Sequence, residues 1–503
     1  MPDFITIAVL IGLGMLIWDC VEVGRNDAAN LVNALLGARV MQRNVAVAIA
    51  ATAVILGASF SAPVMETARK GIFDPSVLTI KMALAIYVSV YFVDTILLYG
   101  FSGFGMPVST TACLVFELVG AALFLAGFDN VQWDKVGTVT AGIIVSIAVS
   151  GTAAFLVMRV CRAPVRDQPE DGEALMLHGP WISGAIISWL AWFMLFKGLK
   201  NVELIKDIKS ATFDVYGEFP ALLAMWAIFT LATHILLVAT HRGWYRYLFP
   251  ALAVLGMICM AFAFGQNDLA NAASPGLAGL TLWRSGSSEG DLADIATKIP
   301  IPIWALFGCG VLMASGMFTT YAQRVTRAEI NTGSQFDQVT LYAPRWCKWL
   351  ASLFVRRQDD ASLAPEPARS DEGKKVHYDT LRASVITAVS ASVIAFASGR
   401  GLPVSTTYVA FAAVLGSGLA DRVFTRGDGV TKAGRASWVL CCWFIAPVIS
   451  IVATGCTARI VYHLSTFALF LCIALNIAVR FFLKRRADRH EQEYHLNAAD
   501  DAK

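Results

Sequence analysis

Apolar residues occur in long unbroken blocks, and this feature most limits what the chain can fold into. A helix needs about 20 such residues to cross the hydrocarbon core of a bilayer, whereas a strand of a membrane barrel alternates apolar and polar side chains. Hydrophobic residues make up 56% of the chain and charged residues 15%, against about 45–50% and about 25% in soluble proteins. The sequence therefore predicts an all-α, polytopic membrane protein of about 12–13 transmembrane helices, at 4–20, 44–62, 81–100, 104–127, 138–160, 181–198, 219–240, 247–266, 298–318, 381–399, 402–420, 436–456 and 460–483.

Basic residues gather at 241–247, 344–357 and 480–490. The positive-inside rule places these segments, and with them the C-terminus, in the cytoplasm. The N-terminal residues lack the basic start of a secretory signal, so the first block is expected to remain as a span. Between the spans, 322–380 is predicted to be a cytoplasmic loop. It is expected to be partly disordered, because 356–375 is charged, contains proline and has no periodicity.

Two motifs occur twice, in the same order. "GRNDAANLVNALLG" at 24–37 matches "GQNDLANAASPGLAG" at 265–279, and "GFGMPVSTT" at 103–111 matches "GRGLPVSTT" at 399–407. Five predicted spans in each half and two between them place the second half upside down in the membrane, which is the inverted repeat of many transporters. The predicted organisation is a first repeat at 1–160, linking helices at 161–246, the second repeat at 247–321 and 381–458 around the loop, and a final helix and tail at 459–503.

The first motif puts carboxylates where a membrane protein normally excludes them. A carboxylate at the centre of the bilayer costs about 2.5–3.5 kcal/mol on insertion scales, so it is retained where it faces a cavity and a partner. In a helix Asn26 and Asn30 share one face, with Asp27 beside them. Amide and carboxylate oxygens are hard ligands that suit a small cation. The glycines that bracket both motifs, including Gly24 and Gly265, are expected to break the helices there.

The second motif favours an anion. In "PVSTT" a proline and hydroxyl residues begin a helical stretch inside an apolar block. A helix that starts within the membrane has N–H groups without intrahelical partners and a positive dipole end, and both attract anions. The matching hydroxyls of the two repeats would add further donors; they are Ser109, Thr110, Thr111, Ser405, Thr406 and Thr407.

Carboxylates and anion donors in one site repel a bare anion unless a cation or a proton binds with it. The sequence therefore predicts symport. A protonated phosphate can donate a hydrogen bond to Asp27 or Asp268, which sulfate cannot do, so these carboxylates could discriminate between the two anions.

These motifs resemble those of the inorganic phosphate transporter (PiT) family, whose signature G-A-N-D-x-A-N-A is duplicated with paired P-V-S-T-T segments. "METARKGI" at 65–72 also resembles the family's E-T-I-R-K-G-I through Glu66, Arg69 and Lys70. The resemblance implies symport of inorganic phosphate with sodium or protons. It implies phosphate binding by Asn26, Asn30, Asn267, Asn271 and the six hydroxyls above, and cation coupling by Asp27, Asp268, Asn26 and Asn267.

The chain departs from the family pattern at four positions. Arg25 and Gln266 replace a small residue, and Ala112 and Tyr408 stand where a histidine often follows Ser-Thr-Thr. Arg25 could neutralise Glu22 or Asp19, or face phosphate, and Glu117 could be a proton or cation relay. These changes leave the coupling ion and the exact anion open.

The alternatives are a permease for sulfate or another oxyanion with the same fold, and a passive anion channel. A membrane enzyme is disfavoured because the histidines form no metal-spaced set. The expected location is the plasma membrane or a bacterial inner membrane. The expected partners are phosphate, the coupling cation and lipid, with no nucleic acid and no cofactor, and a homodimer stays an open alternative.

Overall fold

The all-helical prediction is confirmed. The computed structural model describes residues 3–62, 64–65, 78–165, 172–200, 202–240, 243–284, 302–336, 339, 341–355, 376–425 and 427–500, and within these ranges no strand occurs. The helices are α1 (Phe4–Gly37), α2 (Arg43–Ala58), α4 (Ile80–Gly103), α5 (Thr110–Ala126), η2 (Phe128–Asn130), α6 (Trp133–Arg162), α7 (Gly172–Ala191), η3 (Trp192–Gly198), α8 (Glu203–Tyr216), α9 (Glu218–Ala239), η4 (Tyr245–Tyr247), α10 (Leu248–Arg284), α12 (Ile303–Gly316), α13 (Thr320–Thr332), α14 (Arg345–Phe354), α15 (Thr380–Gly399), α16 (Thr406–Ala420) and α17 (Gly429–Asp500).

The described helices include 8 that are long and apolar enough to cross a membrane. The bent pair α12 and α13, with an angle of 69° between its halves, adds a ninth. Three predicted spans correspond instead to the shorter apolar helices α2, α5 and α16, which fall below the roughly 20 residues needed for a crossing. The long α17 contains two predicted spans and bends at Ser465, whose φ of 51° and ψ of −130° are not helical. The protein is therefore an integral, multi-pass membrane protein.

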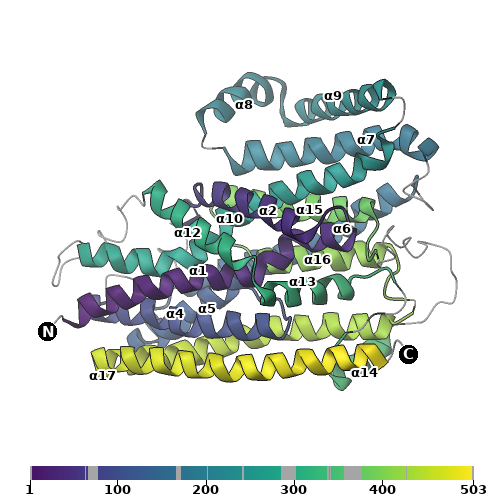
Figure 1. Ribbon diagram of the computed structural model, residues 1–503. Coiled ribbons are helices and arrows are strands. Elements are labelled where there is room, and N and C mark those ends of the chain that lie inside the picture. The colour runs from purple at the N-terminus through teal and green to yellow at the C-terminus, as the bar shows by residue number, and fades with distance from the viewer. Residues whose placement is uncertain are drawn as a thin grey trace.

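Helices of each half pack against helices of the other half in a matched pattern. The α2 helix of the first half packs on α10 of the second, and α12 of the second half packs on α1 of the first. In the same way α6 packs on α16, while α17 packs on α5. Figure 1 shows α1, α10 and α15 running side by side through the middle of the molecule, with α17 along one side. The motif-bearing helices are therefore held at the centre by neighbours from the other half.

The expected breaks at Gly24 and Gly265 are wrong, because α1 and α10 run continuously through both motifs. These glycines permit backbone contact between helices instead. A Cβ on Gly24 would lie 1.8 Å from the Met313 carbonyl oxygen of α12, and one on Gly265 would lie 2.2 Å from the Val54 oxygen of α2. Real Cβ atoms essentially never show distances below 3.0 Å. The chain breaks instead before the second motif, since α4 ends at Gly103 and α15 at Gly399.

The interval 322–380, predicted as one loop, contains two helices. Residues up to Thr332 belong to α13, which packs on α1, and α14 lies against α17. Hydropathy does not reveal α13 because it is a polar helix that follows the apolar α12 after a sharp bend. The segment 356–375, which is predicted to be disordered, lies outside the described residues.

Buried ion pairs fix the end of the bundle where α6, α15 and α16 meet. Arg162 donates to both oxygens of Asp421, from Nε at 3.1 Å and Nη2 at 3.0 Å, and it also pairs with Asp379. Gln335 Nε2 donates to Asp379 Oδ2 at 2.8 Å. Burial alone would raise the pKa of Asp379, but the Arg162 guanidinium and the Gln335 amide hold this pKa below its usual value. Three helices are therefore joined by satisfied charges.

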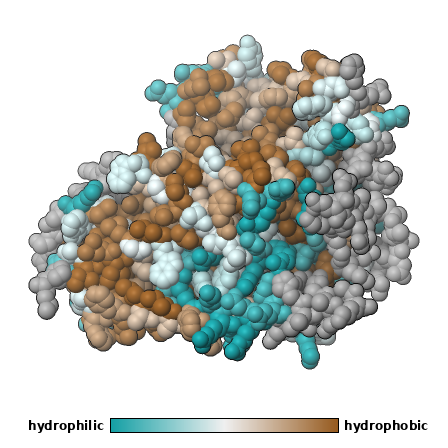
Figure 2. Space-filling view, viewed as in Figure 1, coloured by the Kyte–Doolittle hydropathy of each residue, from teal (hydrophilic) through white to brown (hydrophobic). Residues whose placement is uncertain are grey.

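A layer of three helices stands apart from this bundle. The α7, α8 and α9 helices lie together at the top of Figure 1, joined to the bundle by contacts of α7 with α10 and α15. Apolar side chains cover much of the face in Figure 2, while hydrophilic ones gather toward its lower centre and right. This distribution fits a surface that is largely in contact with lipid.

Candidate functional site

The duplicated motifs meet in the interior. Asp27 and Asp268 are fully buried on α1 and α10, at 0% exposure each. The PVSTT segments follow the breaks after α4 and α15, and each starts a short helix at its second hydroxyl residue. Ser109 Oγ accepts from the Ala112 N–H at 3.0 Å, and Ser405 Oγ accepts from the Tyr408 N–H at 3.1 Å.

The first copy of the Asn-Asp motif, at 24–37, contacts the PVSTT segments of both repeats. Asn26 Nδ2 donates to the Val108 carbonyl at 2.6 Å and lies 2.9 Å from Asp27 Oδ1. Asn30 Nδ2 reaches the same Asp27 oxygen at 3.0 Å. Thr407, from the second repeat, donates its hydroxyl to Asp27 Oδ1 at 2.7 Å. One carboxylate oxygen therefore collects donors from both halves of the chain.

The second copy of the Asn-Asp motif, at 265–279, repeats this arrangement. Asn267 Nδ2 donates to the Val404 carbonyl at 2.8 Å and lies 3.2 Å from Asp268 Oδ1. Asn271 Nδ2 donates to the same Asp268 oxygen at 2.9 Å and to Thr111 Oγ1 at 2.7 Å. Thr111, from the first repeat, lies 3.3 Å from Asp268 Oδ1. The two half-sites thus correspond, with the repeats exchanged.

The two half-sites differ in the contacts of their carboxylates. The hydroxyls of Thr110 and Thr406 both lie against Asp268, with Thr406 at 2.6 Å from Oδ2 and Thr110 at 3.4 Å from Oδ1. Asp27 Oδ2 has no hydrogen-bond partner in the described part of the chain, and neither have the buried amide oxygens of Asn30 and Asn271. Buried oxygens without donors are costly, and they are suited to a cation or to a ligand that donates a hydrogen bond.

The structure gathers ten of the twelve predicted site residues into two hydrogen-bonded clusters, one around each carboxylate. The first consists of Asn26, Asp27, Asn30 and Thr407, and the second of Thr110, Thr111, Asn267, Asp268, Asn271 and Thr406. Ser109 and Ser405 lie next to these clusters but use their hydroxyl oxygens to cap the short helices. Their phosphate-binding role stays a prediction, since a capping oxygen can still donate its hydrogen.

Sequence reasoning missed a polar pair that extends the site. Asn33 Nδ2 donates to Glu329 Oε2 at 2.7 Å, and both residues are buried. Asn33 lies seven residues after Asn26, so it shares the amide face of α1, and this spacing could have revealed it. Hydropathy places Glu329 in a loop because α13 has no apolar block of its own.

The structure answers the question of Arg25. Its Nη1 atom lies 2.8 Å from Glu22 Oε2, and Arg480 of the last helix donates to Glu22 Oε1 at 2.9 Å. Glu22, and not Asp19, is therefore the ion-pair partner of Arg25, and it is shared with Arg480. A contact of Arg25 with phosphate stays a prediction. Glu117 is buried with Ser450 Oγ at 3.4 Å, and its relay role stays a prediction. The stretch that carries Glu66, Arg69 and Lys70 lies outside the described residues.

The fold and the site define a class of protein. It is an integral membrane protein of packed and broken helices, whose duplicated motifs enclose a polar site away from lipid. Residues 23–331 match the model of the phosphate transporter family. The chain belongs to this family, and its membership supports phosphate as the transported substrate.

Individual relatives extend the match over nearly the whole chain. A phosphate-permease homologue from Thermococcus kodakarensis is 27% identical over 87% of this chain and 94% of its own length. Inorganic phosphate transporter 2-1, chloroplastic, from Arabidopsis thaliana is 24% identical over 88% of this chain and 69% of its own. A solved structure of a protein described as "The sodium-dependent phosphate transporter" superposes with a TM-score of 0.66 at 20% identity, covering 91% of this chain and 98% of the other. The last match shows the shared fold.

Exchanging the crossing threonines for valine tests the shared site. Thr111→Val and Thr407→Val keep the side-chain shape and remove the hydroxyl beside a carboxylate of the opposite half. A hydrogen bond to a charged group contributes about 1.5–3 kcal/mol, so we expect the KM for phosphate uptake to rise by about 10- to 100-fold in each variant. Serine at the same positions should restore most of the affinity. Wild-type KM values in both valine variants would remove these hydroxyls from the site.

Proposed function

We propose that the protein is a secondary symporter that carries inorganic phosphate together with sodium by alternating access. The observation that carries this proposal is the crossed arrangement of the two half-sites. Thr407 of the second repeat binds Asp27 of the first, and Thr111 of the first lies against Asp268 of the second. A movement of one repeat against the other would therefore remake the site, as coupling between binding and conformational change requires.

The anion would bind at the starts of α5 and α16. Each short helix begins with a threonine, Thr110 or Thr406, whose hydroxyl lies beside Asp268. The positive ends of both helices would therefore meet at this point. A monoprotonated phosphate can also donate its hydrogen to an oxygen that has no donor, such as Asp27 Oδ2. Sulfate lacks this hydrogen at neutral pH, so the same atom would favour phosphate.

The cation would take the remaining oxygens. The amide oxygens of Asn30 and Asn271 are also buried and lack hydrogen-bond donors within the described ranges, and the Asp27 carboxylate beside Asn30 supplies the negative charge. A set of one carboxylate and neutral oxygens suits a small hard cation. The similar solved structure is that of a transporter described as sodium-dependent, which favours sodium over a proton. By the positive-inside rule, the basic segments would put the C-terminus in the cytoplasm.

Uptake into proteoliposomes tests the proposal. We expect an inward sodium gradient to drive accumulation of labelled phosphate above equilibrium, and a proton gradient of equal size to drive none. Arsenate should compete and sulfate should not. Accumulation on the proton gradient alone would make the proton the coupling ion. A passive channel would show no counterflow of labelled phosphate against an unlabelled load, and that result would overturn transport by alternating access.

A further inference from the structure

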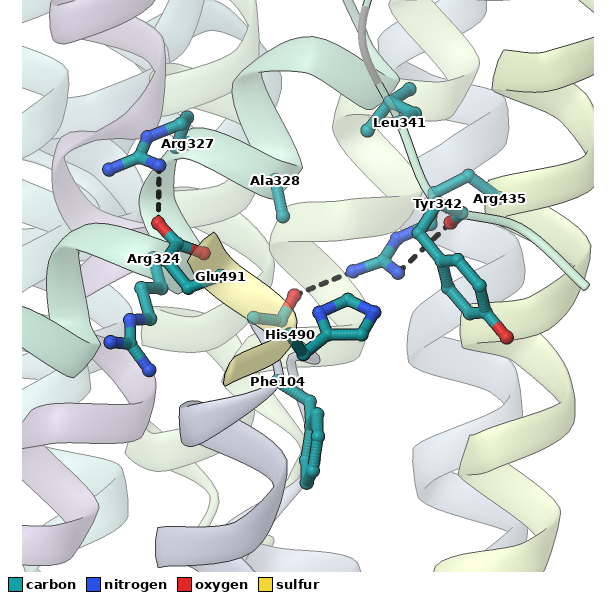
Figure 3. A pocket seen from close by; sticks show the side chains of 10 residues that line it. Phe104, Arg324, Arg327, Ala328, Leu341, Tyr342, Arg435, His490 and Glu491 are labelled. Carbon is teal, nitrogen blue, oxygen red and sulfur yellow. Dashed lines mark hydrogen bonds and ion pairs between the residues drawn. The ribbon is translucent and has the colours of Figure 1, made fainter. Parts of the chain in front are cut away.

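A second group of basic side chains surrounds a cleft of about 50 Å³ (Figure 3). None of the twelve predicted site residues lines this cleft. It lies where the end of α4 meets α13 and both ends of α17, and its basic lining residues are Arg324, Arg327, Arg435 and His490. Such a concentration of guanidinium groups is typical of sites for phosphate or carboxylate groups.

Two of the arginines are engaged by carboxylates from the end of α17. Arg324 Nη2 lies 2.7 Å from Asp488 Oδ1, and Arg327 Nη1 lies 2.6 Å from Glu491 Oε1. The residues are three apart on each helix, so the two pairs form adjacent rungs between α13 and α17. Because a guanidinium donates to carboxylate and phosphate oxygens in the same geometry, these acidic groups occupy the positions that an oxyanion would take.

Asp488 and Glu491 can be displaced from the two arginines. Each ion pair has one member well exposed to solvent: Asp488 is 39% exposed beside Arg324 at 15%, and Arg327 is 41% exposed beside Glu491 at 22%. Ion pairs that reach solvent contribute little to stability. Both carboxylates follow the last apolar block of the chain, so their release would not disturb the packing of the spans. A doubly charged oxyanion can therefore compete with them.

The cleft is also joined to the central site. Arg435 Nη2 donates to the Gly105 carbonyl at 2.7 Å, and Arg324 Nη1 donates to the Gly103 carbonyl at 3.3 Å. Gly105, with a φ of 65°, forms the turn between α4 and the first PVSTT segment. Three residues later the Val108 carbonyl accepts from Asn26. Any ligand that draws these arginines away from the two glycine carbonyls would act on the loop that builds the site.

We propose that this cleft is a second oxyanion site, which binds a phosphate group in exchange for Asp488 and Glu491. The phosphate group comes either from free inorganic phosphate or from the headgroup of an anionic phospholipid. The proposal rests on the chemistry of the cleft and does not depend on symport at the central site. Binding there would link the concentration of phosphate on the face that carries the C-terminal end of α17 to the conformation of the PVSTT loop.

Equilibrium binding of labelled inorganic phosphate to the full chain in nanodiscs of neutral phosphatidylcholine tests the proposal. We expect two classes of site in the wild type. The double variant Arg324→Gln/Arg327→Gln should weaken the cleft class at least about tenfold, and Asp488→Asn/Glu491→Gln should tighten it about fivefold. If the arginines had a purely structural role, both variants would change the affinity for phosphate in the same direction, because both remove the two ion pairs between α13 and α17. Arg246→Gln, which removes an exposed charge elsewhere, should leave both classes unchanged.

The failure of this proposal is distinguishable from failure at the central site. Asp27→Asn should affect only the other class of site, so the cleft class is identified by its response to the four cleft substitutions. In nanodiscs that contain phosphatidylglycerol, loss of the cleft class identifies the lipid headgroup as the occupant, and its retention identifies free phosphate. A single class of site in neutral nanodiscs, insensitive to all four substitutions, would overturn the proposal.

Discussion

Asp27→Asn and Asp268→Asn should each reduce concentrative phosphate uptake by more than about 100-fold. Each carboxylate gathers amide and hydroxyl donors from both repeats, and hydrogen bonds to a charged group contribute about 1.5–3 kcal/mol each. Asparagine has nearly the same shape, but it removes the charge that balances a cation beside the anion. The measurement is initial uptake of labelled phosphate into proteoliposomes under a sodium gradient.

Asp129→Asn is the matched control, because Asp129 is exposed in η2 and lies in no site. It should transport at the wild-type rate. Both buried variants should still elute as folded protein, since the substitution preserves volume. Normal accumulation by Asp27→Asn and Asp268→Asn would exclude the two carboxylates from the mechanism.

Gly24→Ala should destabilise the protein by about 3 kcal/mol or more. The new Cβ would lie 1.8 Å from the Met313 carbonyl oxygen, so α1 and α12 would have to separate. Gly316, on the other side of this contact, already approaches the Val21 carbonyl in the same way, with an ideal Cβ distance of 2.0 Å. Backbone atoms on both helices cannot give way as a flexible side chain would. The measurement is the fraction of monodisperse protein that survives a temperature series in detergent.

Gly14→Ala supplies the control on the same helix. A Cβ at Gly14 meets nothing within 4 Å, and alanine is the better helix former by about 1 kcal/mol. We expect this variant to be at least as heat-stable as the wild type. Equal loss of folded protein in both variants would contradict the close-packing account of Gly24, because Gly14 has open space for the new methyl group.

The fold class and the members of the site were accessible from the sequence because both depend on local patterns. Continuous apolar blocks indicate membrane helices wherever they occur, and a motif that occurs twice in matching order indicates a duplicated site. The six hydroxyls and the two Asn-Asp clusters needed no knowledge of distant contacts to be selected.

The remaining features depend on neighbours that are distant in the chain. The role of Gly24 is set by α12, which belongs to the other half of the chain, so its sequence context alone suggests a break where the helix in fact continues. Glu329 was missed because a polar helix gains its place only by packing on α1. The exchange of Thr111 and Thr407 between the half-sites, and the free oxygen of Asp27, likewise follow from how the two repeats pack.

The position of the bound anion tests the central claim most directly. Crystals grown with sodium and arsenate, which resembles phosphate, would give an anomalous signal from arsenic. We predict a strong peak between the first turns of α5 and α16, within hydrogen-bond distance of the Thr110 and Thr406 hydroxyls and adjacent to Asp27, separate from any peak at the cleft of Arg324 and Arg327. A peak elsewhere, with no arsenic beside Thr110 and Thr406, would contradict a phosphate site built jointly by the two repeats.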